Sequence, residues 1–379
     1  MMRTLKLSNE IDFKKTLRKL GVDGGGVEIL ASKMQHHIFY IKELHVGAAN
    51  ILKQDALSIG ADLAVPRGTV IAMHKTVDAI LIATQKQLVE LSRKELAQPF
   101  GLKELAQKLK VFSKISKPEK VEIMGIINAN DDSFFQKSRF KDVSALLKIE
   151  QMIEEGASII DIGGVSSRPG SLHVSADEEL SRIKPIVDAL YAQKVYENTA
   201  LSIDSYEPNV IFYVLERGFK IVNDITGLAN DEVCKLCASY GAKAVIMHMQ
   251  GKPQDMQYDP SYDNVVLHVE DFFQERIEKA QSFGIKDLIL DVGIGFGKTL
   301  QHNIELIKNL EHFLHLGYPL LVGASRKSMI DKISPSKIED RIGGTLALHL
   351  KAADNGASIL RVHDVYEHSQ ALHVRNALR

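Results

Sequence analysis

The stretch EIMGIIN at residues 122–128 is the first of eight short apolar runs that decide the fold. The other seven follow it along the last two-thirds of the chain: SIIDIGG (158–164), ALSID (200–204), IVNDITG (221–227), AVIMHM (244–249), LILDVGIG (288–295), PLLVGAS (319–325) and SILRVHD (358–364). Runs of this kind, rich in Ile, Val and Leu and without polar alternation, are typical of parallel strands buried on both faces. Segments with helical periodicity separate them, so the sequence predicts an α/β fold, a TIM (β/α)8 barrel.

The segments between the runs carry helix signals. VSALLKIEQMIEEG (143–156) places its apolar residues on one stripe, as an amphipathic helix does. Ser175, with Glu178 three residues later, is a capping box that begins the next helix. Pro185 lies inside that helix and is expected to kink or interrupt it. Further amphipathic helices are expected over residues 264–282 and 302–315.

The length of the chain predicts two domains. Residues 119–379 match the roughly 250 residues typical of this barrel. Residues 1–118 mix short strands with about three helices, which indicates a small α+β N-terminal domain, interpreted as a stabilising or oligomerisation module. SKISKPEK (113–120) is the expected linker, and Gly24–Gly26 is expected to be a flexible turn. A second activity in this domain is not indicated, because it shows no nucleophile cluster or phosphate loop.

Composition limits the partners and the location. The formal net charge is −1, so no global basic field attracts nucleic acid or an anionic membrane. The start of the chain lacks the apolar core of a signal peptide, and no uncharged apolar run reaches 18 residues. A cytoplasmic location is therefore expected. Cys234 and Cys237 form a lone C-x-x-C inside a predicted helix and are interpreted as packing residues.

Acidic and amide side chains end several of the predicted strands. Asp204, Asn223 and Asp291 each follow an apolar run, and a TIM barrel gathers such strand ends at one mouth. Two carboxylates and an amide suit a heterocycle with several N–H donors and ring acceptors, such as a pterin. Lys327 in ASRKS can donate to a ring carbonyl or nitrogen.

A second group of side chains suits an anion. Arg361 and His363 alternate on the last strand and so face the same side, and Arg168 lies in the loop after the second strand. Arginine gives bidentate contacts to phosphate, and histidine can protonate a leaving oxygen. The glycine-rich DVGIGFGKT (291–299) misses the spacing of both a P-loop and a dinucleotide fingerprint, so it does not indicate a nucleotide.

The motifs in their order resemble those of the dihydropteroate synthase family. The matching segments are EIMGIINANDDSF, IIDIGGVSSRPG, LSIDSY, VNDITG, VIMHMQGKPQDMQ, LILDVGIGFGKT, PLLVGASRKSMI, RIGGTLA and ILRVHDV, which span nearly all of residues 121–379. The resemblance implies a TIM-barrel transferase of folate biosynthesis that is usually a homodimer. It implies that the substrates are 6-hydroxymethyl-7,8-dihydropterin pyrophosphate and p-aminobenzoate, with Mg²⁺ as cofactor and sulfonamides as competitors.

The resemblance also implies roles for individual residues. The pterin is expected to be bound by Asp204, Asn223, Asp291 and Lys327, with Met247 lining its pocket. The pyrophosphate and Mg²⁺ are expected to be held by Asn128, Arg361 and His363. The p-aminobenzoate site is expected to be shaped by Ser167, Arg168, Pro169, Phe296 and Ser328, and the first loop contributes Asp132, Ser133 and Phe134. Displacement is expected to be dissociative, with Asp204 stabilising positive charge on the pterin.

Two loops depart from the family pattern. Asn130 and Asp131 stand where the family has Thr and Pro, and Val165 stands where it has Glu. The first change predicts looser loop closure, and the second removes a carboxylate. Two alternatives are a non-catalytic pterin-binding module and the pterin-binding domain of a methyltransferase. The methyltransferase domain would lack the anion-binding group and Lys327.

Overall fold

The computed structural model describes residues 4–5, 7, 12–129, 143–165, 174–251 and 256–378. The chain divides into two compact units, one up to Ser116 and the other over Lys117–Leu378. Among the described residues, every helix is too short or too polar to cross a lipid bilayer.

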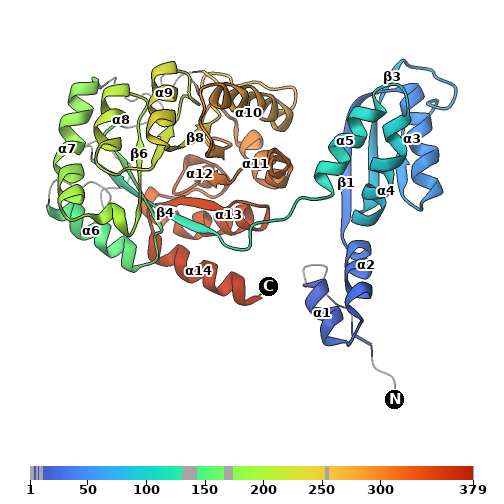
Figure 1. The fold of residues 1–379 in the computed structure, drawn as a ribbon, viewed down its shortest axis with the longest axis horizontal. Helices are drawn as coiled ribbons and strands as arrows, with labels where there is room; N and C mark the ends of the chain where they lie inside the picture. Colours follow the sequence, from blue (N-terminus) through green and yellow to red (C-terminus); the bar gives the residue numbers. More distant parts are fainter. Residues whose placement is uncertain are drawn as a thin grey trace. The chain divides into compact units, whose positions relative to one another are not determined.

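The larger unit is a closed barrel of eight parallel strands (Figure 1). The strands are β4 (Glu122–Asn128), β5 (Ile159–Gly163), β6 (Ala200–Asp204), β7 (Ile221–Asp224), β8 (Lys243–Met247), β9 (Leu288–Asp291), β10 (Leu320–Val322) and β11 (Ile359–Val362). The ring closes because β4 pairs with β11, with Met124 opposite Arg361. These are the eight apolar runs of the sequence, so the predicted TIM barrel is confirmed.

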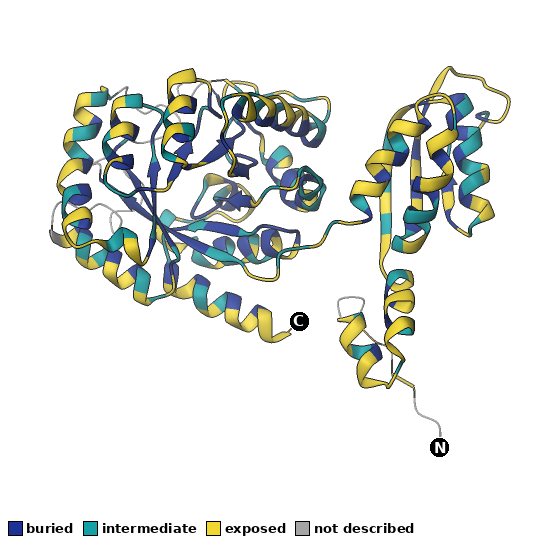
Figure 2. Cartoon of the chain, in the orientation of Figure 1, coloured by how far each residue is buried: buried dark blue, intermediate teal, exposed yellow. Residues whose placement is uncertain are grey.

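Helices surround the barrel, with their buried sides toward the strands (Figure 2). They are α6 (Val143–Glu154), α7 (Ala176–Ala192), α8 (Pro208–Leu215), α9 (Asp231–Tyr240), α10 (Val265–Ser282), α11 (Leu300–Lys308), α12 (Ser328–Ile333), α13 (Ile342–Asp354) and α14 (Val365–Leu378). Short 3-10 helices are η3 (Val195–Glu197), η4 (Leu310–Leu316) and η5 (Ile338–Asp340).

Three local predictions can be compared with the helices. The expected interruption at Pro185 is wrong, because α7 runs continuously through it. Proline removes one backbone donor, and packing of Ile186 and Val187 in the core favours continuity. The helix expected over residues 302–315 is instead α11 followed by η4. Cys234 and Cys237 are buried in α9 and pack in the core, as predicted.

The smaller unit is an α+β fold around a three-stranded antiparallel sheet. Its strands are β1 (His36–His45), β2 (Asp62–Ala64) and β3 (Thr76–Thr84), in the order β1-β3-β2. Its helices are α1 (Phe13–Lys19), α2 (Gly24–Met34), α3 (Val46–Ser58), α4 (Gln85–Lys94), η1 (Glu95–Ala97) and α5 (Leu102–Phe112). Gly24–Gly26 begin α2 rather than forming a flexible turn, so that prediction is wrong.

Side chains that point into the barrel lie in layers, and one of these layers contains the candidate site residues. A layer of buried apolar side chains fills the interior: Met124, Ile159, Ile221, Val245, Ile289, Leu321 and Ile359. Side chains two residues further along a strand face the same way. The next layer toward the C-terminal ends therefore contains Asp161, Asn223, Met247, Asp291 and Arg361. Apart from Met247, these side chains are polar, whereas the first layer is apolar.

Candidate active site

Arg361 connects the polar side chains at the barrel mouth. Its Nε donates to Asp161 Oδ2 at 2.6 Å, and its Nη2 donates to Asp204 Oδ2 at 2.6 Å. Asn223 Nδ2 donates to the same Asp161 oxygen at 3.1 Å. Residues from β5, β6, β7 and β11 thus form one hydrogen-bonded group, as expected where parallel strands end together.

Asp161 was missed in the sequence, although it lies at the centre of this group. It is fully buried on β5, and its Oδ1 has no hydrogen-bond partner among the described residues. A buried oxygen without a partner costs free energy, so it is a position at which a ligand donor or a cation would be favourable. The signal was available, because Asp161 lies two residues after the interior Ile159.

Burial and neighbouring charges shift the pKa values of the ionisable side chains at the mouth. Burial raises the pKa of Asp204 to about 6, although Arg361 opposes the rise. Burial also raises the pKa of Asp291, against the attraction of Lys327. Burial lowers the pKa of Lys327 to about 8, and the neighbouring Asp291 limits the fall. Groups whose pKa values move toward neutrality are common at catalytic sites.

Lys327 reaches the mouth from the segment between β10 and α12. Its Nζ donates to the backbone oxygen of Ile294 and lies 4.4 Å from the centre of the Phe296 ring. Gly295 has a positive φ of 85°, and a Cβ there would come within 3.2 Å of the Lys327 side chain. The glycine-rich turn after β9 therefore makes room for this lysine.

The same turn is held by a second lysine, Lys298. It is buried, and its Nζ contacts His248 Nδ1 at 2.9 Å and the backbone oxygens of His248, Gly293 and Phe296 at 2.9–3.1 Å. Burial lowers the pKa of Lys298 well below its ordinary value. Gly293 permits this packing, because a Cβ there would lie 1.9 Å from the His248 oxygen. Lys298 thus ties the turn to the end of β8 rather than binding a nucleotide phosphate.

The last strand and the segment after β10 are joined near the mouth. His363 Nδ1 and Ser325 Oγ are 2.9 Å apart. The neighbouring Arg326 makes paired hydrogen bonds to Asp364, through Nε at 2.9 Å and Nη2 at 2.8 Å. Sequence reasoning did not assign Arg326, whose partner becomes visible only when β10 and β11 are paired. The pair fixes the backbone immediately before Lys327 and immediately after His363.

The remaining predicted residues fall into two sets. Asn128 ends β4, Met247 is buried at the end of β8, Phe296 is partly buried in the glycine-rich turn, and Ser328 is exposed at the start of α12. Six others lie outside the described residues: Asp132, Ser133, Phe134, Ser167, Arg168 and Pro169.

Comparisons with known proteins show which proteins this chain is similar to. A family model described as pterin binding enzyme matches residues 124–363. The chain is 41% identical over 374 residues to the bifunctional dihydropteroate synthase/dihydropteroate reductase of Helicobacter pylori, covering 99% of this chain and 98% of that protein. It is 43% identical over 259 residues to the dihydropteroate synthase of Haemophilus influenzae, covering 68% of this chain and 93% of that protein.

A solved structure resembles the barrel. The crystal structure of Yersinia pestis dihydropteroate synthase with a sulfonamide drug complex has a TM-score of 0.66 and 39% sequence identity. The match covers 69% of this chain and 94% of that chain. Relatives with this level of identity favour an active transferase over a binding module or a methyltransferase domain.

Proposed function

The chain belongs to the dihydropteroate synthase family of pterin-binding enzymes. We propose a role for each residue of the candidate active site in the transfer reaction. Asp204, Asn223, Asp291 and Lys327 bind the pterin ring, and Met247 lines its pocket. The observation that carries this assignment is the hydrogen-bonded group around Arg361, which brings Asp204 and Asn223 to one barrel mouth.

The reaction joins the pterin methylene carbon to the amino group of p-aminobenzoate and releases pyrophosphate. We propose a dissociative displacement, in which the pterin ring delocalises the positive charge that develops as pyrophosphate departs. Asp204 and Asp291 stabilise that charge electrostatically, and Arg361 and His363 attract the departing anion. The weakly basic aniline nitrogen needs placement rather than activation, so its contribution is proximity.

Mg²⁺ fits the donors at the mouth. Asn128 offers an amide oxygen at the end of β4, and the adjacent β5 carries the buried Asp161 Oδ1 without a partner among the described residues. Magnesium prefers oxygen ligands and retains water and phosphate ligands, so few protein oxygens suffice. Asn128 would hold the ion together with the diphosphate, and when bound the ion would neutralise the charge of the leaving group.

We also propose the p-aminobenzoate site. The Phe296 ring, in the turn after β9, lies 4.4 Å from Lys327 Nζ, and Ser328 follows Lys327 at the start of α12. By the family resemblance, Ser167, Arg168 and Pro169 would contribute to the p-aminobenzoate site, and Asp132, Ser133 and Phe134 would belong to the first loop; all six lie outside the described residues. The Yersinia pestis relative has been crystallised with a sulfonamide, which supports the proposal that sulfonamides compete with p-aminobenzoate here.

A direct assay tests these assignments. Purified full-length chain is incubated with pterin pyrophosphate and p-aminobenzoate, with and without Mg²⁺, and 7,8-dihydropteroate is measured. The expected result is Mg²⁺-stimulated product formation that a sulfonamide inhibits competitively against p-aminobenzoate. Product formation that is indifferent to sulfonamide would reject the second-substrate site.

A second candidate function concerns the smaller unit. The Helicobacter pylori relative, named for a reductase activity as well, aligns with 99% of this chain, whereas the Haemophilus influenzae synthase aligns with only 68%. We propose that this chain also reduces dihydropteroate, which revises the expectation drawn from the sequence. A reduction requires no nucleophile or phosphate loop, so their lack in the sequence was weak evidence. A hydride would be added to carbon 6 and a proton to nitrogen 5, with reduced nicotinamide or reduced flavin as donor.

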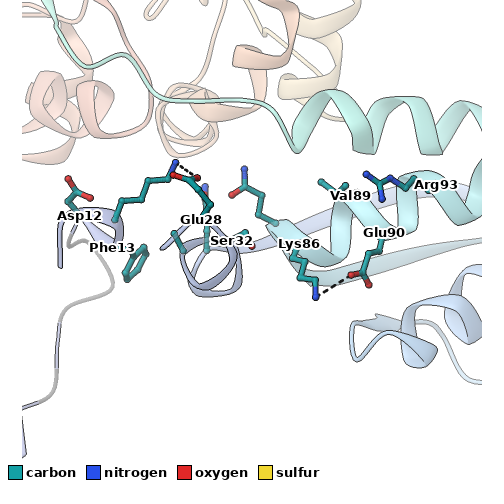
Figure 3. Close-up of a pocket in the computed structure, with 12 residues that line it drawn as sticks. Asp12, Phe13, Glu28, Ser32, Lys86, Val89, Glu90 and Arg93 are labelled. Carbon is teal, nitrogen blue, oxygen red and sulfur yellow. Dashed lines mark ion pairs between the residues drawn. The ribbon is translucent and has the colours of Figure 1, made fainter. Parts of the chain in front are cut away.

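The smaller unit has a groove that could serve this activity. It has a volume of about 530 Å³ and lies beside α1, α2 and α4 (Figure 3). Its lining combines ion pairs, Lys14 with Glu28 and Lys86 with Glu90, with the guanidinium of Arg93. Because Lys14 and Lys86 each pair with a carboxylate, the guanidinium of Arg93 is the group that we expect to contact a phosphate of a redox cofactor. The test supplies dihydropteroate and each hydride donor to the full chain and measures tetrahydropteroate; no product with any donor rejects the proposal.

Two further properties remain proposals. We propose a homodimer, as is usual in the family, and light scattering on the purified chain tests it. We propose that the protein acts in the cytoplasm, which the two buried free cysteines, Cys234 and Cys237, support because reducing compartments keep thiols free. Cell fractionation tests the location.

A further inference from the structure

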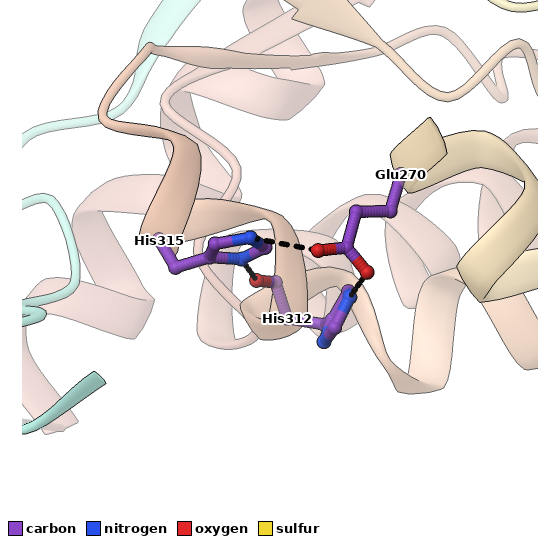
Figure 4. Close-up of side chains that lie close together, drawn as sticks. All are labelled: Glu270, His312 and His315. Atoms are coloured by element: carbon purple, nitrogen blue, oxygen red, sulfur yellow. Dashed lines mark hydrogen bonds and ion pairs between the residues drawn. The ribbon is translucent and has the colours of Figure 1, made fainter. Parts of the chain in front are cut away.

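Three side chains with metal-binding atoms meet outside the barrel mouth, between α10 and η4. They are Glu270 on α10 and His312 and His315 on η4 (Figure 4). One ligand atom from each lies within 4.8 Å of the other two. The histidines are three residues apart on a 3-10 helix, in which such positions eclipse, so both rings face the same way.

The Glu270 carboxylate lies between the two rings. Its Oε2 is 3.0 Å from His312 Nε2, and its Oε1 is 3.0 Å from His315 Nε2. Gln274 Nε2 also donates to Oε1, at 3.1 Å. The Glu270 side chain is only 8% exposed, so its charge is largely removed from water and requires compensation inside the protein.

The hydrogen bonds of His315 indicate that a cation lies between its ring and the Glu270 carboxylate. His315 Nδ1 lies 2.5 Å from the backbone oxygen of His312, and a carbonyl oxygen only accepts hydrogen bonds. Nδ1 therefore carries a proton, and in the neutral ring Nε2 presents a lone pair toward the Glu270 carboxylate. Two acceptors at 3.0 Å repel each other unless a cation lies between them. A histidine that donates one ring N–H to a carbonyl is also the usual arrangement for metal ligands.

We propose that Glu270, His312 and His315 bind a divalent transition-metal ion, with Zn²⁺ the best match. Two imidazoles and one carboxylate suit zinc and its neighbours rather than Mg²⁺, which prefers oxygen alone. Ligand atoms about 2.0–2.2 Å from zinc lie roughly 3.3 Å apart in a tetrahedron. Each imidazole nitrogen is 3.0 Å from a different oxygen of Glu270, so zinc binding requires only a small adjustment of these three side chains. The His312 side chain is 26% exposed, which leaves a path for water as fourth ligand.

The site has a structural role in this proposal. η4 ends at Leu316 and leads directly into β10, which begins at Leu320. An ion bound at η4 and α10 would fix the start of this strand from the outer layer. Its ligands come from surrounding helices and not from the strand ends, so it is separate from the Mg²⁺ proposed at the mouth.

The alternative cation is a proton. A doubly protonated His315 would form a salt bridge with Glu270 and leave no ligand lone pair. The experiment therefore measures metal binding itself. Chelator-treated full-length chain is titrated with Zn²⁺ by calorimetry and with Co²⁺ by visible absorption, for wild type, His315→Gln, Glu270→Gln and His312→Asn. The matched control is His373→Gln, an exposed histidine on α14. Circular dichroism establishes that each variant is folded.

The expected result is one equivalent of Zn²⁺, a tetrahedral Co²⁺ spectrum, and binding weakened at least about tenfold in each ligand variant. The His373→Gln control is expected to bind as wild type does. Zn²⁺ should also raise the melting temperature of wild type and not that of His315→Gln. Equal binding by wild type and the ligand variants, or no binding by folded wild type, overturns the proposal in favour of a salt bridge. His312→Asn, at the exposed side of the site, serves as the second variant if a buried substitution prevents folding.

Discussion

Arg361 on β11 and Asp204 on β6 form an ion pair at the barrel mouth, with Nη2 and Oδ2 2.6 Å apart. The same guanidinium bonds Asp161 through Nε, also at 2.6 Å. The sequence assigned Arg361 to the departing anion and Asp204 to the pterin, as if they were separate groups. The ion pair makes them one electrostatic unit, in which Arg361 neutralises carboxylates while its side chain, 20% exposed, still borders the mouth.

Replacing Arg361 should therefore affect both stability and turnover. Arg361→Gln leaves Asp161 and Asp204 buried without their counter-charge, which we expect to lower the free energy of unfolding by about 3–5 kcal/mol. Loss of the cation should lower kcat by at least about a hundredfold. Denaturant unfolding and initial rates check the two effects. Arg18→Gln, at an exposed arginine on α1, is the control and should change neither. Turnover close to wild type in Arg361→Gln contradicts the assigned role.

The two lysines of the mouth should respond differently. Lys327→Ala removes a donor that bonds the Ile294 backbone oxygen and lies over the Phe296 ring, so we expect turnover to be abolished and the fold to survive. Lys298→Met removes a donor shared by His248, Gly293 and Phe296, and leaving those oxygens unsatisfied should cost roughly 2–4 kcal/mol of stability. Thermal unfolding and product formation distinguish them. Full activity in Lys327→Ala rejects the assignment of the pterin site.

The fold could be predicted because its strands are short, continuous apolar segments. Strands covered on both faces are uniformly apolar, and each apolar run became one strand, from Glu122–Asn128 to Ile359–Val362. The family could be predicted as well, because nine segments that resemble its motifs follow one another in the family's order. The continuity of α7 through Pro185 could not be predicted, because it depends on packing that the local sequence does not reveal.

The site could be predicted as a set of residues but not as a set of contacts. Arg361 bonds Asp161 and Asp204, which are 200 and 157 residues away in the sequence, and no local sequence pattern predicts such partners. Asp161 does not end a strand but lies within β5, so the rule that functional residues follow strand ends does not identify it. From the sequence, Lys298 was interpreted only as part of a glycine-rich segment that does not match a nucleotide-binding motif. Its four contacts depend on how the ends of β8 and β9 pack, which the local sequence does not show.

The pH dependence of kcat/KM should follow two groups at the mouth. Asp204 stabilises positive charge only as a carboxylate, and its pKa is raised to about 6, so activity should fall below about pH 6. Lys327 must be protonated to donate its charge, and its pKa is lowered to about 8, so activity should fall above about pH 8. Rates measured from about pH 5 to pH 10 should give a bell-shaped profile. A rate that stays constant down to pH 5 contradicts the role of Asp204.

Glu95 should make the smaller unit less stable as the pH rises. It is fully buried in η1, and neither carboxylate oxygen has a hydrogen-bond partner among the described residues. Burial, reinforced by the charge of Asp55, raises its pKa from 4.5 to about 7. Between these values the folded state binds a proton that the unfolded state has lost. Stability is therefore greatest below about pH 4.5 and declines until about pH 7, by roughly 1–3 kcal/mol.

Glu95→Gln removes this titration while retaining the shape of the side chain. We expect the variant to lose the decline between pH 4.5 and 7 and to exceed wild type in stability at pH 8. Hydrogen exchange of the α3 and α4 amides in the full chain measures the effect locally, without interference from unfolding of the barrel. Glu90→Gln is the matched control, because Glu90 lies on α4 with its side chain 38% exposed. If Glu95→Gln and Glu90→Gln show the same pH dependence as wild type, Glu95 is already ionised in the folded protein, and a cation beside it must supply the compensation.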